Sequence, residues 1–309
     1  MMRAAACVAL LALTAGCGAR EPDPRYRPTE SVLEVVAVLH RHVPDDTYRF
    51  PPAEDYTGRN VYRASLIRLE NLERAYAGSL QSGGLDDVIA FAKGRALERL
   101  RAFDVAATNY RRAAEQPGEL HDEALRSAAL CEAIAEANRL GGSGPLEAPA
   151  ELPARLAALD ARLAMLGKLE GDARGSHYAA VVKEEIEHAQ VARAQLLVAA
   201  RPLSPDGDVR ALSALQQLVV DQRDSKNANA HLLALADLYA ELAREYVDAN
   251  PPASLGFDPP QFEELVDSAA RLYESVANQD GAPEKLEAGQ RLEAFLAFTL
   301  RVDRDRFTP

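Results

Sequence analysis

The sequence predicts an all-α protein built from antiparallel helix pairs, with about eleven helices in all, and three observations support this fold class. Hydrophobic residues make up 48% of the chain. Alanine and leucine supply most of them, whereas β-branched residues, which favour strands, are sparse. Apolar residues recur three and four positions apart, and glycine and proline divide these periodic stretches into segments of ordinary helix length.

Two helices are predicted before residue 85. Ser31 and Glu34 form a capping box at the start of the first helix, and Pro44 follows its end. The second helix covers 60–77, and we expect Gly78 to end it. The connection over 44–60 is long and rich in proline and aromatic residues, so it either packs along neighbouring helices or offers a contact surface.

The clearest unit in the chain is the stretch 85–118, which predicts two short helices with a tight connection near Ala102. Gly94 lowers helix propensity in the first of them, so we expect two backbones to come close at this position. The second helix carries small and aromatic residues at helical spacing and stops at a proline. These positions are Ala106, Tyr110, Ala113 and Pro117.

In this order and spacing, the residues from Gly94 to Pro117 resemble the tetratricopeptide repeat, a helical hairpin of about 34 residues. The chain departs from the family pattern at Ala90, where the repeat carries a large aromatic residue. A weaker resemblance covers 231–283, interrupted by NPPASLGFDPP. The resemblance implies a right-handed superhelical solenoid in which stacked hairpins leave a concave groove.

The remaining helices are placed by the same periodicity. They are expected over 119–140, 151–168, 176–200, 208–223, 231–246, 261–278 and 284–302. The stretch GGSGPLEAPA at 141–150 is the best linker candidate. It either divides an N-terminal helical-repeat part (29–140) from a C-terminal one (151–309) or replaces a tight turn.

The first residues form a short basic start followed by an apolar run too short to span a bilayer, as in an export signal. The run ends in Leu13-Thr14-Ala15-Gly16-Cys17, which resembles the lipobox of bacterial lipoproteins. The resemblance implies that 1–16 is a signal peptide and that Cys17 carries acyl chains such as palmitate. An ordinary signal peptide with a coincidental cysteine is the alternative. Residues 17–28 would form an extended tether.

Composition and the absence of known motifs restrict the classes of function that we expect. A net charge of −12 and the absence of tryptophan disfavour nucleic acid as a partner. The chain has no glycine-rich phosphate loop, no HExxH, no CxxC and no nucleophile elbow, so we expect no enzyme and no cofactor. Cys131 lies among apolar helical positions and is expected to be a buried, inert thiol.

One metal-like pair stands out in KEEIEHA, where Glu185 and His188 are three residues apart on one helix face. Ferritin-like proteins use such Glu-x-x-His pairs on two helices, but here the second pair is missing. A solvated helix face is the alternative interpretation, because charged helices often contain such a triplet.

We therefore expect a lipoprotein of the bacterial cell envelope that acts as a protein–protein interaction scaffold or assembly subunit. Its partners would be other envelope proteins or peptide segments, and the resemblance to lipoproteins favours the outer membrane, facing the periplasm. Exposed candidates for the groove are Arg95, Glu98 and Arg99, which could equally serve solubility. Alternatives are a small-molecule or metal-binding helical lipoprotein with Glu185 and His188 at its site, or a self-associating structural protein.

Overall fold

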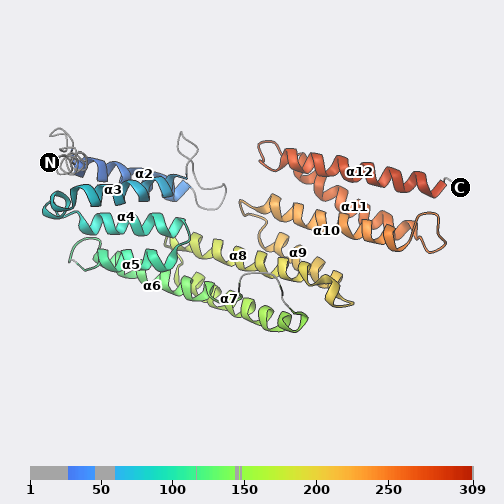
Figure 1. Ribbon diagram of the computed structural model, residues 1–309, viewed down its shortest axis with the longest axis horizontal. Helices are drawn as coiled ribbons and strands as arrows, with labels where there is room; N and C mark the ends of the chain where they lie inside the picture. Colours follow the sequence, from blue (N-terminus) through green and yellow to red (C-terminus); the bar gives the residue numbers. More distant parts are fainter. Residues whose placement is uncertain (1–26, 46–59, 116, 143–145, 147, 308–309) are drawn as a thin grey trace, which may run out of the picture.

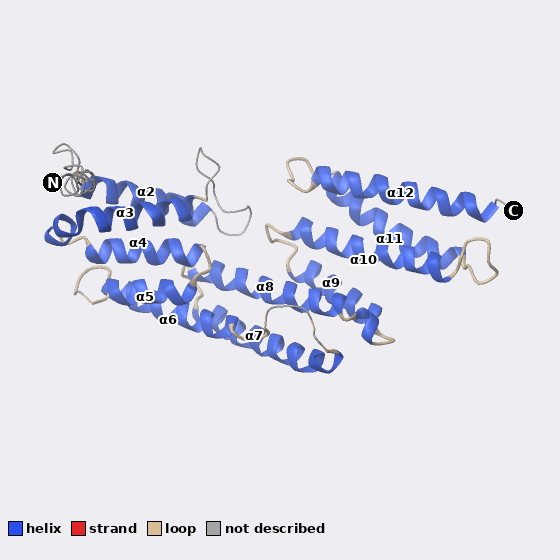
Figure 2. Cartoon of the chain, viewed as in Figure 1, coloured by secondary structure: helices blue, strands red, loops and turns tan. Residues whose placement is uncertain are grey.

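The computed structural model describes residues 27–45, 60–115, 117–142, 146 and 148–307. These residues form eleven α-helices, two 3-10 helices and no strand, which confirms the predicted all-α fold class (Figure 2). The predicted signal peptide, Cys17 and most of the tether lie outside the described residues.

The helices follow the periodic segments of the sequence closely. They are α2 (Pro28–Asp45), α3 (Val61–Ser82), α4 (Asp86–Arg99), α5 (Phe103–Ala113), α6 (His121–Asn138), α7 (Leu152–Asp172), α8 (Tyr178–Ala199), α9 (Gly207–Asp221), α10 (Ala228–Ala249), α11 (Pro259–Ala277) and α12 (Lys285–Phe307). Short 3-10 turns, Pro149–Glu151 and Arg201–Leu203, precede α7 and α9.

Three predicted boundaries are wrong. Helix α2 begins at Pro28, before the predicted capping box of Ser31 and Glu34, and it continues through Pro44 to Asp45. Gly78 does not end the second helix, because α3 continues through it to Ser82. The backbone instead leaves helical values locally at Tyr76 (φ −131°, ψ 26°) and then resumes the helix, so α3 is kinked rather than broken. The end comes at Gly84, whose φ of 67° suits glycine in the left-handed region.

Helices that follow each other in sequence pack side by side, and the chain runs back and forth through the array (Figure 1). In the view of Figure 1, α2 to α6 stack into one arm, α7 to α9 form the base, and α10 to α12 form the second arm. Helix α2 also contacts α4, and α10 contacts α12, so alternate helices share a face of each arm. The predicted right-handed superhelix stays a prediction.

The hydrophobic core continues across the predicted linker. One cluster joins Tyr110 and Cys131, which precede residues 141–150, to Tyr178 and Val182, which follow them. Cys131 is fully buried, and burial raises the pKa of its thiol, so the predicted buried thiol is confirmed. Further clusters fill the N-terminal arm around Leu69 and the C-terminal arm around aromatic residues of α11 and α12.

Gly94 is a packing site, although not the one expected. A Cβ atom at this position would lie 2.6 Å from Cε1 of Tyr110, so the close neighbour is an aromatic ring rather than a second backbone. Tyr110 is itself fully buried against the following helices. Glycine therefore lets α4 and α5 approach over the face of this ring.

Candidate functional site

The three residues predicted for the groove lie on the last two turns of α4, and the structure separates their environments. Glu98 is 2% exposed, and the Arg99 side chain is 7% exposed. The expectation that both are exposed is therefore wrong: Tyr110 of α5 contacts Glu98, and Arg99 lies between Glu184 of α8 and the ring of Tyr62. Arg95 keeps 18% of its side-chain surface exposed and lines a cavity.

Glu98 is the buried carboxyl group of this region. The hydroxyl of Tyr110 donates to its Oε2 atom at 2.9 Å. Nη1 of Arg95 lies 4.0 Å from Oε2, and Nε2 of His177 lies 3.9 Å from Oε1. Oε1 has no hydrogen-bond partner among the described residues. Burial raises the pKa of Glu98, and the nearby guanidinium of Arg95 only partly opposes that rise.

Arg95 is held between aromatic rings. Its guanidinium carbon lies 5.1 Å from the centre of the Phe91 ring and 5.6 Å from that of Tyr178. It hydrogen-bonds to Nε2 of His177 and reaches Glu123 at 3.5 Å. Burial, followed by the charges of Arg95 and Arg99, lowers the pKa of His177 to about 3. His177 is therefore neutral at physiological pH and accepts a hydrogen bond from Arg95.

A cavity of about 560 Å³ opens beside this network, between α2, α4 and the segments that lead into α6 and α8. Most of its wall is apolar, and Arg95 and His177 form its polar end. The lining residues are Val36, Leu39, His40, Val88, Phe91, Ala92, Arg95, Glu119, Leu120 and His177. A mainly apolar hollow with a few convergent polar groups is the usual form of a binding site.

The metal-like pair Glu185 and His188 is used differently from either prediction. Glu185 is 1% exposed, so the solvated-face interpretation is wrong for it. Arg101 donates to both of its oxygens, at 2.6 and 2.9 Å, and Asn138 donates at 2.8 Å. Arg162 lies 3.5 Å away. The described residues contain no group of three metal-ligating side chains, and the partners of this carboxylate are mostly cations.

Burial works to raise the pKa of Glu185, but the hydrogen bonds and charge of Arg101 outweigh it and the pKa is lowered. The pKa of His188 is also lowered, first by burial and then by Arg101. The lowered pKa of Glu185 identifies a carboxylate that is ionised and neutralised by cations. The carboxylate therefore forms a junction between the α4–α5 turn, α6 and α7.

Arg101 occupies an unusual backbone position to make this contact. Its φ is 60°, the only positive value outside glycine in the described chain. Ala102 N–H donates to the carbonyl of Leu97 and Arg101 N–H to that of Glu98, both at 2.9 Å. This is a Schellman motif, whose left-handed position normally holds glycine. Sequence reasoning missed Arg101, because its local signal resembles any charged helix end.

Helix α8 extends the same junction toward the C-terminal arm. Glu187 accepts hydrogen bonds from Ser225 at 2.6 Å and Asn227 at 3.0 Å, and pairs with His231 at 2.7 Å. Its pKa is lowered because these contacts outweigh burial. Glu184 lies 3.1 Å from Lys226. The KEEIEHA segment therefore joins α8 to α4–α6, to α7 and to α10 through neighbouring carboxylates.

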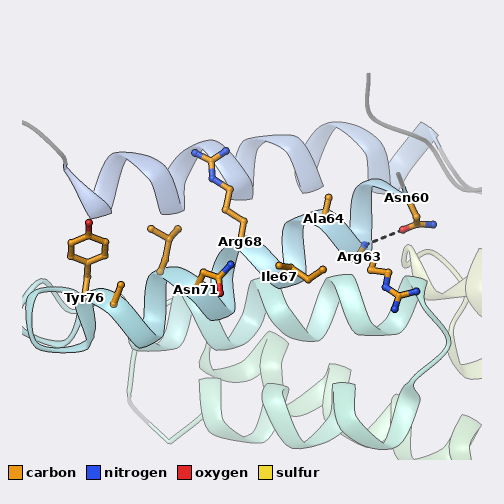
Figure 3. A pocket seen from close by; sticks show the side chains of 9 residues that line it. Asn60, Arg63, Ala64, Ile67, Arg68, Asn71 and Tyr76 are labelled. Atoms are coloured by element: carbon orange, nitrogen blue, oxygen red, sulfur yellow. Dashed lines mark hydrogen bonds between the residues drawn. The ribbon is translucent and has the colours of Figure 1, made fainter. Parts of the chain in front are cut away.

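A second hollow, of about 760 Å³, runs along the outer face of α3. Figure 3 shows its side chains projecting from this one helix, with the Asn60 side chain capping the helix by accepting from Arg63 N–H at 3.0 Å. Ile67 is half exposed, and Arg68 pairs with Glu34 of α2 at 2.5 Å. All of its lining residues belong to α3 or to its N-cap, whereas the cavity beside Arg95 draws its wall from several elements.

Comparison with known proteins adds no functional assignment to this geometry. No protein-family model matches the chain, and no curated protein matches its sequence. None of the described helices is both long and apolar enough to cross a membrane.

Proposed function

We propose that this chain is a lipid-anchored interaction scaffold of the bacterial cell envelope, which holds segments of other envelope proteins on its helical array. The observation that carries the proposal is the apolar cavity beside Arg95, on the face where α2 and α4 lie together. Helical arrays bind partner segments in hollows of this kind. Aromatic and arginine side chains such as Phe91 and Arg95 are also enriched at the energetic centres of interfaces.

The lipid anchor proposed at Cys17 is the second part of this function. Lipid attached to Cys17, followed by the tether over 17–28, would hold the helical body close to one membrane surface. Such confinement raises the effective concentration of partners in the same membrane, so modest affinity at the cavity is sufficient. We place the body at the outer membrane, facing the periplasm.

The experiment has two parts. Labelling cells with radioactive palmitate tests the anchor: label on the native chain and none on Cys17→Ser supports it, whereas equal labelling of both contradicts it. Crosslinking before lysis, solubilisation in detergent and mass spectrometry then compare the partners of the two forms. Defined envelope proteins recovered with the native chain and lost with Cys17→Ser support the scaffold, and identical background recovery from both overturns it.

A further inference from the structure

We infer that the cavity beside Arg95 recognises a peptide segment in which a bulky apolar side chain stands next to a single carboxylate. The apolar side chain would fill the hollow between α2 and α4, and Arg95 would bind the carboxylate. This inference depends on the proposed scaffold function and specifies the chemistry of its partner.

Arg95 has spare capacity to bind a carboxylate. Its two carboxylate neighbours lie at 3.5 Å (Glu123) and 4.0 Å (Glu98). By contrast, Arg101 meets Glu185 at 2.6 Å, and Arg139 meets Asp104 at 2.8 Å. Charge-assisted hydrogen bonds are normally about 2.7–2.9 Å long, so Arg95 makes no full-strength contact with either carboxylate.

The Arg95 side chain is already oriented for binding. The rings of Phe91 and Tyr178 contact its guanidinium, and His177 accepts one of its hydrogen bonds. A long side chain that is fixed before binding loses little further entropy when it meets its partner. Because the lowered pKa of His177 keeps that ring neutral, it competes for Arg95 without the charge of a carboxylate.

The walls and rim of the cavity also fit an apolar side chain beside one carboxylate. Val36, Val88, Phe91 and Leu120 are only partly buried, so they still have apolar surface to cover with a bound side chain. Glu119 is exposed at the lining and would repel a second carboxylate. With a net charge of −12, the whole chain also disfavours strongly acidic partners. The site therefore fits one carboxylate beside an apolar anchor.

The test uses the purified full chain in detergent and a display library of random short peptides. Enriched sequences are synthesised in pairs that differ only by a carboxylate and its amide, and their affinities are measured by fluorescence anisotropy. Loss of the carboxylate should weaken binding roughly tenfold to a hundredfold, as expected for a charge-assisted hydrogen bond. The variant Arg95→Gln should bind both members of a pair equally weakly.

Matched variants separate the site from general effects. Arg139→Gln removes an arginine that pairs with Asp104, is 67% exposed and does not line the cavity, so it should leave affinity unchanged. Glu123→Gln should strengthen binding by freeing Arg95. Ala92→Phe places a ring in the cavity without touching the charges, and it should abolish binding even if Arg95→Gln proves too unstable to measure.

The inference is supported if the affinity of the enriched peptides falls when their carboxylate is removed, when Arg95 is replaced and when the cavity is filled. No enrichment, or enriched peptides whose affinity is insensitive to both Arg95→Gln and Ala92→Phe, overturns it. The scaffold function fails separately, through the crosslinking experiment. Partners that crosslink equally well to Ala92→Phe and to the native chain would leave the scaffold intact while removing this cavity from its mechanism.

Discussion

At the scale of single residues, the contact of Gly94 with Tyr110 gives the sharpest packing prediction. Gly94→Ala gains helix propensity of up to about 1 kcal/mol but forces a methyl group onto a fully buried ring. Overpacking of this kind costs about 1–3 kcal/mol, so we expect a net loss of stability in urea denaturation.

The matched control is Gly167→Ala in α7. No atom lies within 4 Å of the added methyl group there, so only the gain in helix propensity remains. We expect this variant to be as stable as the native chain or more so. Equal behaviour of the two alanine variants would contradict the packing role assigned to Gly94.

The buried carboxylate of Glu185 gives a second prediction at this scale. Glu185→Ala leaves the guanidinium of Arg162, whose side chain is 11% exposed, without its buried counter-charge. Breaking a buried ion pair in this way costs about 3–5 kcal/mol, which thermal unfolding followed by circular dichroism should detect. Glu170→Ala removes an exposed carboxylate from α7 and should change stability by less than about 0.5 kcal/mol. A similar loss in both variants would mean that Glu185 does not form the junction.

These residues mark the limit of prediction from sequence. Periodicity indicated that the Cys131 position is buried, because burial follows from apolar neighbours on one helix face. The same periodicity could not show that Glu98 and Glu185 are buried. The contacts that bury or neutralise them come partly from other elements: the Tyr110 hydroxyl of α5 donates to Glu98, and Arg101 is 84 residues away from Glu185 in the chain. A charged residue on a helix reads as solvated until its distant partner is known.

At the scale of elements, the turn between α4 and α5 combines a strained backbone with a strong ion pair. Holding a residue other than glycine in the left-handed region costs about 1–2 kcal/mol, and the contact with Glu185 offsets that cost at Arg101. Arg101→Gly should therefore destabilise the native chain, because the buried carboxylate loses its bidentate partner.

The effect of Arg101→Gly on stability should reverse its sign once the side chain at position 185 carries no charge. In a Glu185→Gln background, Arg101→Gly relieves the backbone strain and sacrifices no ion pair, so we expect a gain of about 1 kcal/mol. A double-mutant cycle measured by urea denaturation provides the comparison. Equal destabilisation by Arg101→Gly in both backgrounds would show that backbone strain and charge are not coupled at this turn.

Helix positions were largely predictable, since each helix carries its own apolar stripe and stop signals. The exception at Gly78 has a physical reason: a methyl group added to this glycine would meet no atom within 4 Å, so no close neighbour forces the chain to turn there. Gly84, six residues later, has the left-handed φ that ends the helix. Composition alone cannot distinguish these two glycines.

At the scale of the whole molecule, His177 and the carboxylates of α8 make stability fall in acid. His177 has a pKa near 3 in the fold, below its usual 6.5, so the unfolded chain binds more protons once the pH drops below about 6.5. The free energy of unfolding should fall by about 1 kcal/mol between pH 7 and 5. This figure is discounted for solvent screening, because about a third of the His177 side chain lies in water. Below about pH 4.5, the lowered pKa values of Glu185 and Glu187 add to the loss.

Urea denaturation across this pH range measures the effect. His177→Gln keeps a polar side chain but does not titrate, so it should reduce the slope between pH 7 and 5 to the part that the lowered pKa of His188 contributes, while retaining the steeper loss in stronger acid. His121 lies at the start of α6 and serves as a control through His121→Gln. An unchanged slope in the His177 variant would place the acid sensitivity elsewhere.

The sequence predicted a helical array but not how its parts are joined. Residues 141–150 looked like a divider, and the domain boundary there stays a prediction. The structure shows that residues on both sides share one hydrophobic cluster and that α8 binds elements on both sides. Such a junction depends on tertiary proximity between residues far apart in sequence, which no local pattern records.

The burial of Cys131 has a kinetic consequence. Its sulfur is enclosed at the centre of the cluster that spans both sides of the predicted linker, so a thiol reagent reaches it only when that cluster opens. With Cys7 and Cys17 replaced by serine, the rate of labelling by a disulfide reagent would report the opening of the central cluster under native conditions. The protein therefore carries a single internal probe, placed where the helices of its N-terminal arm meet α8.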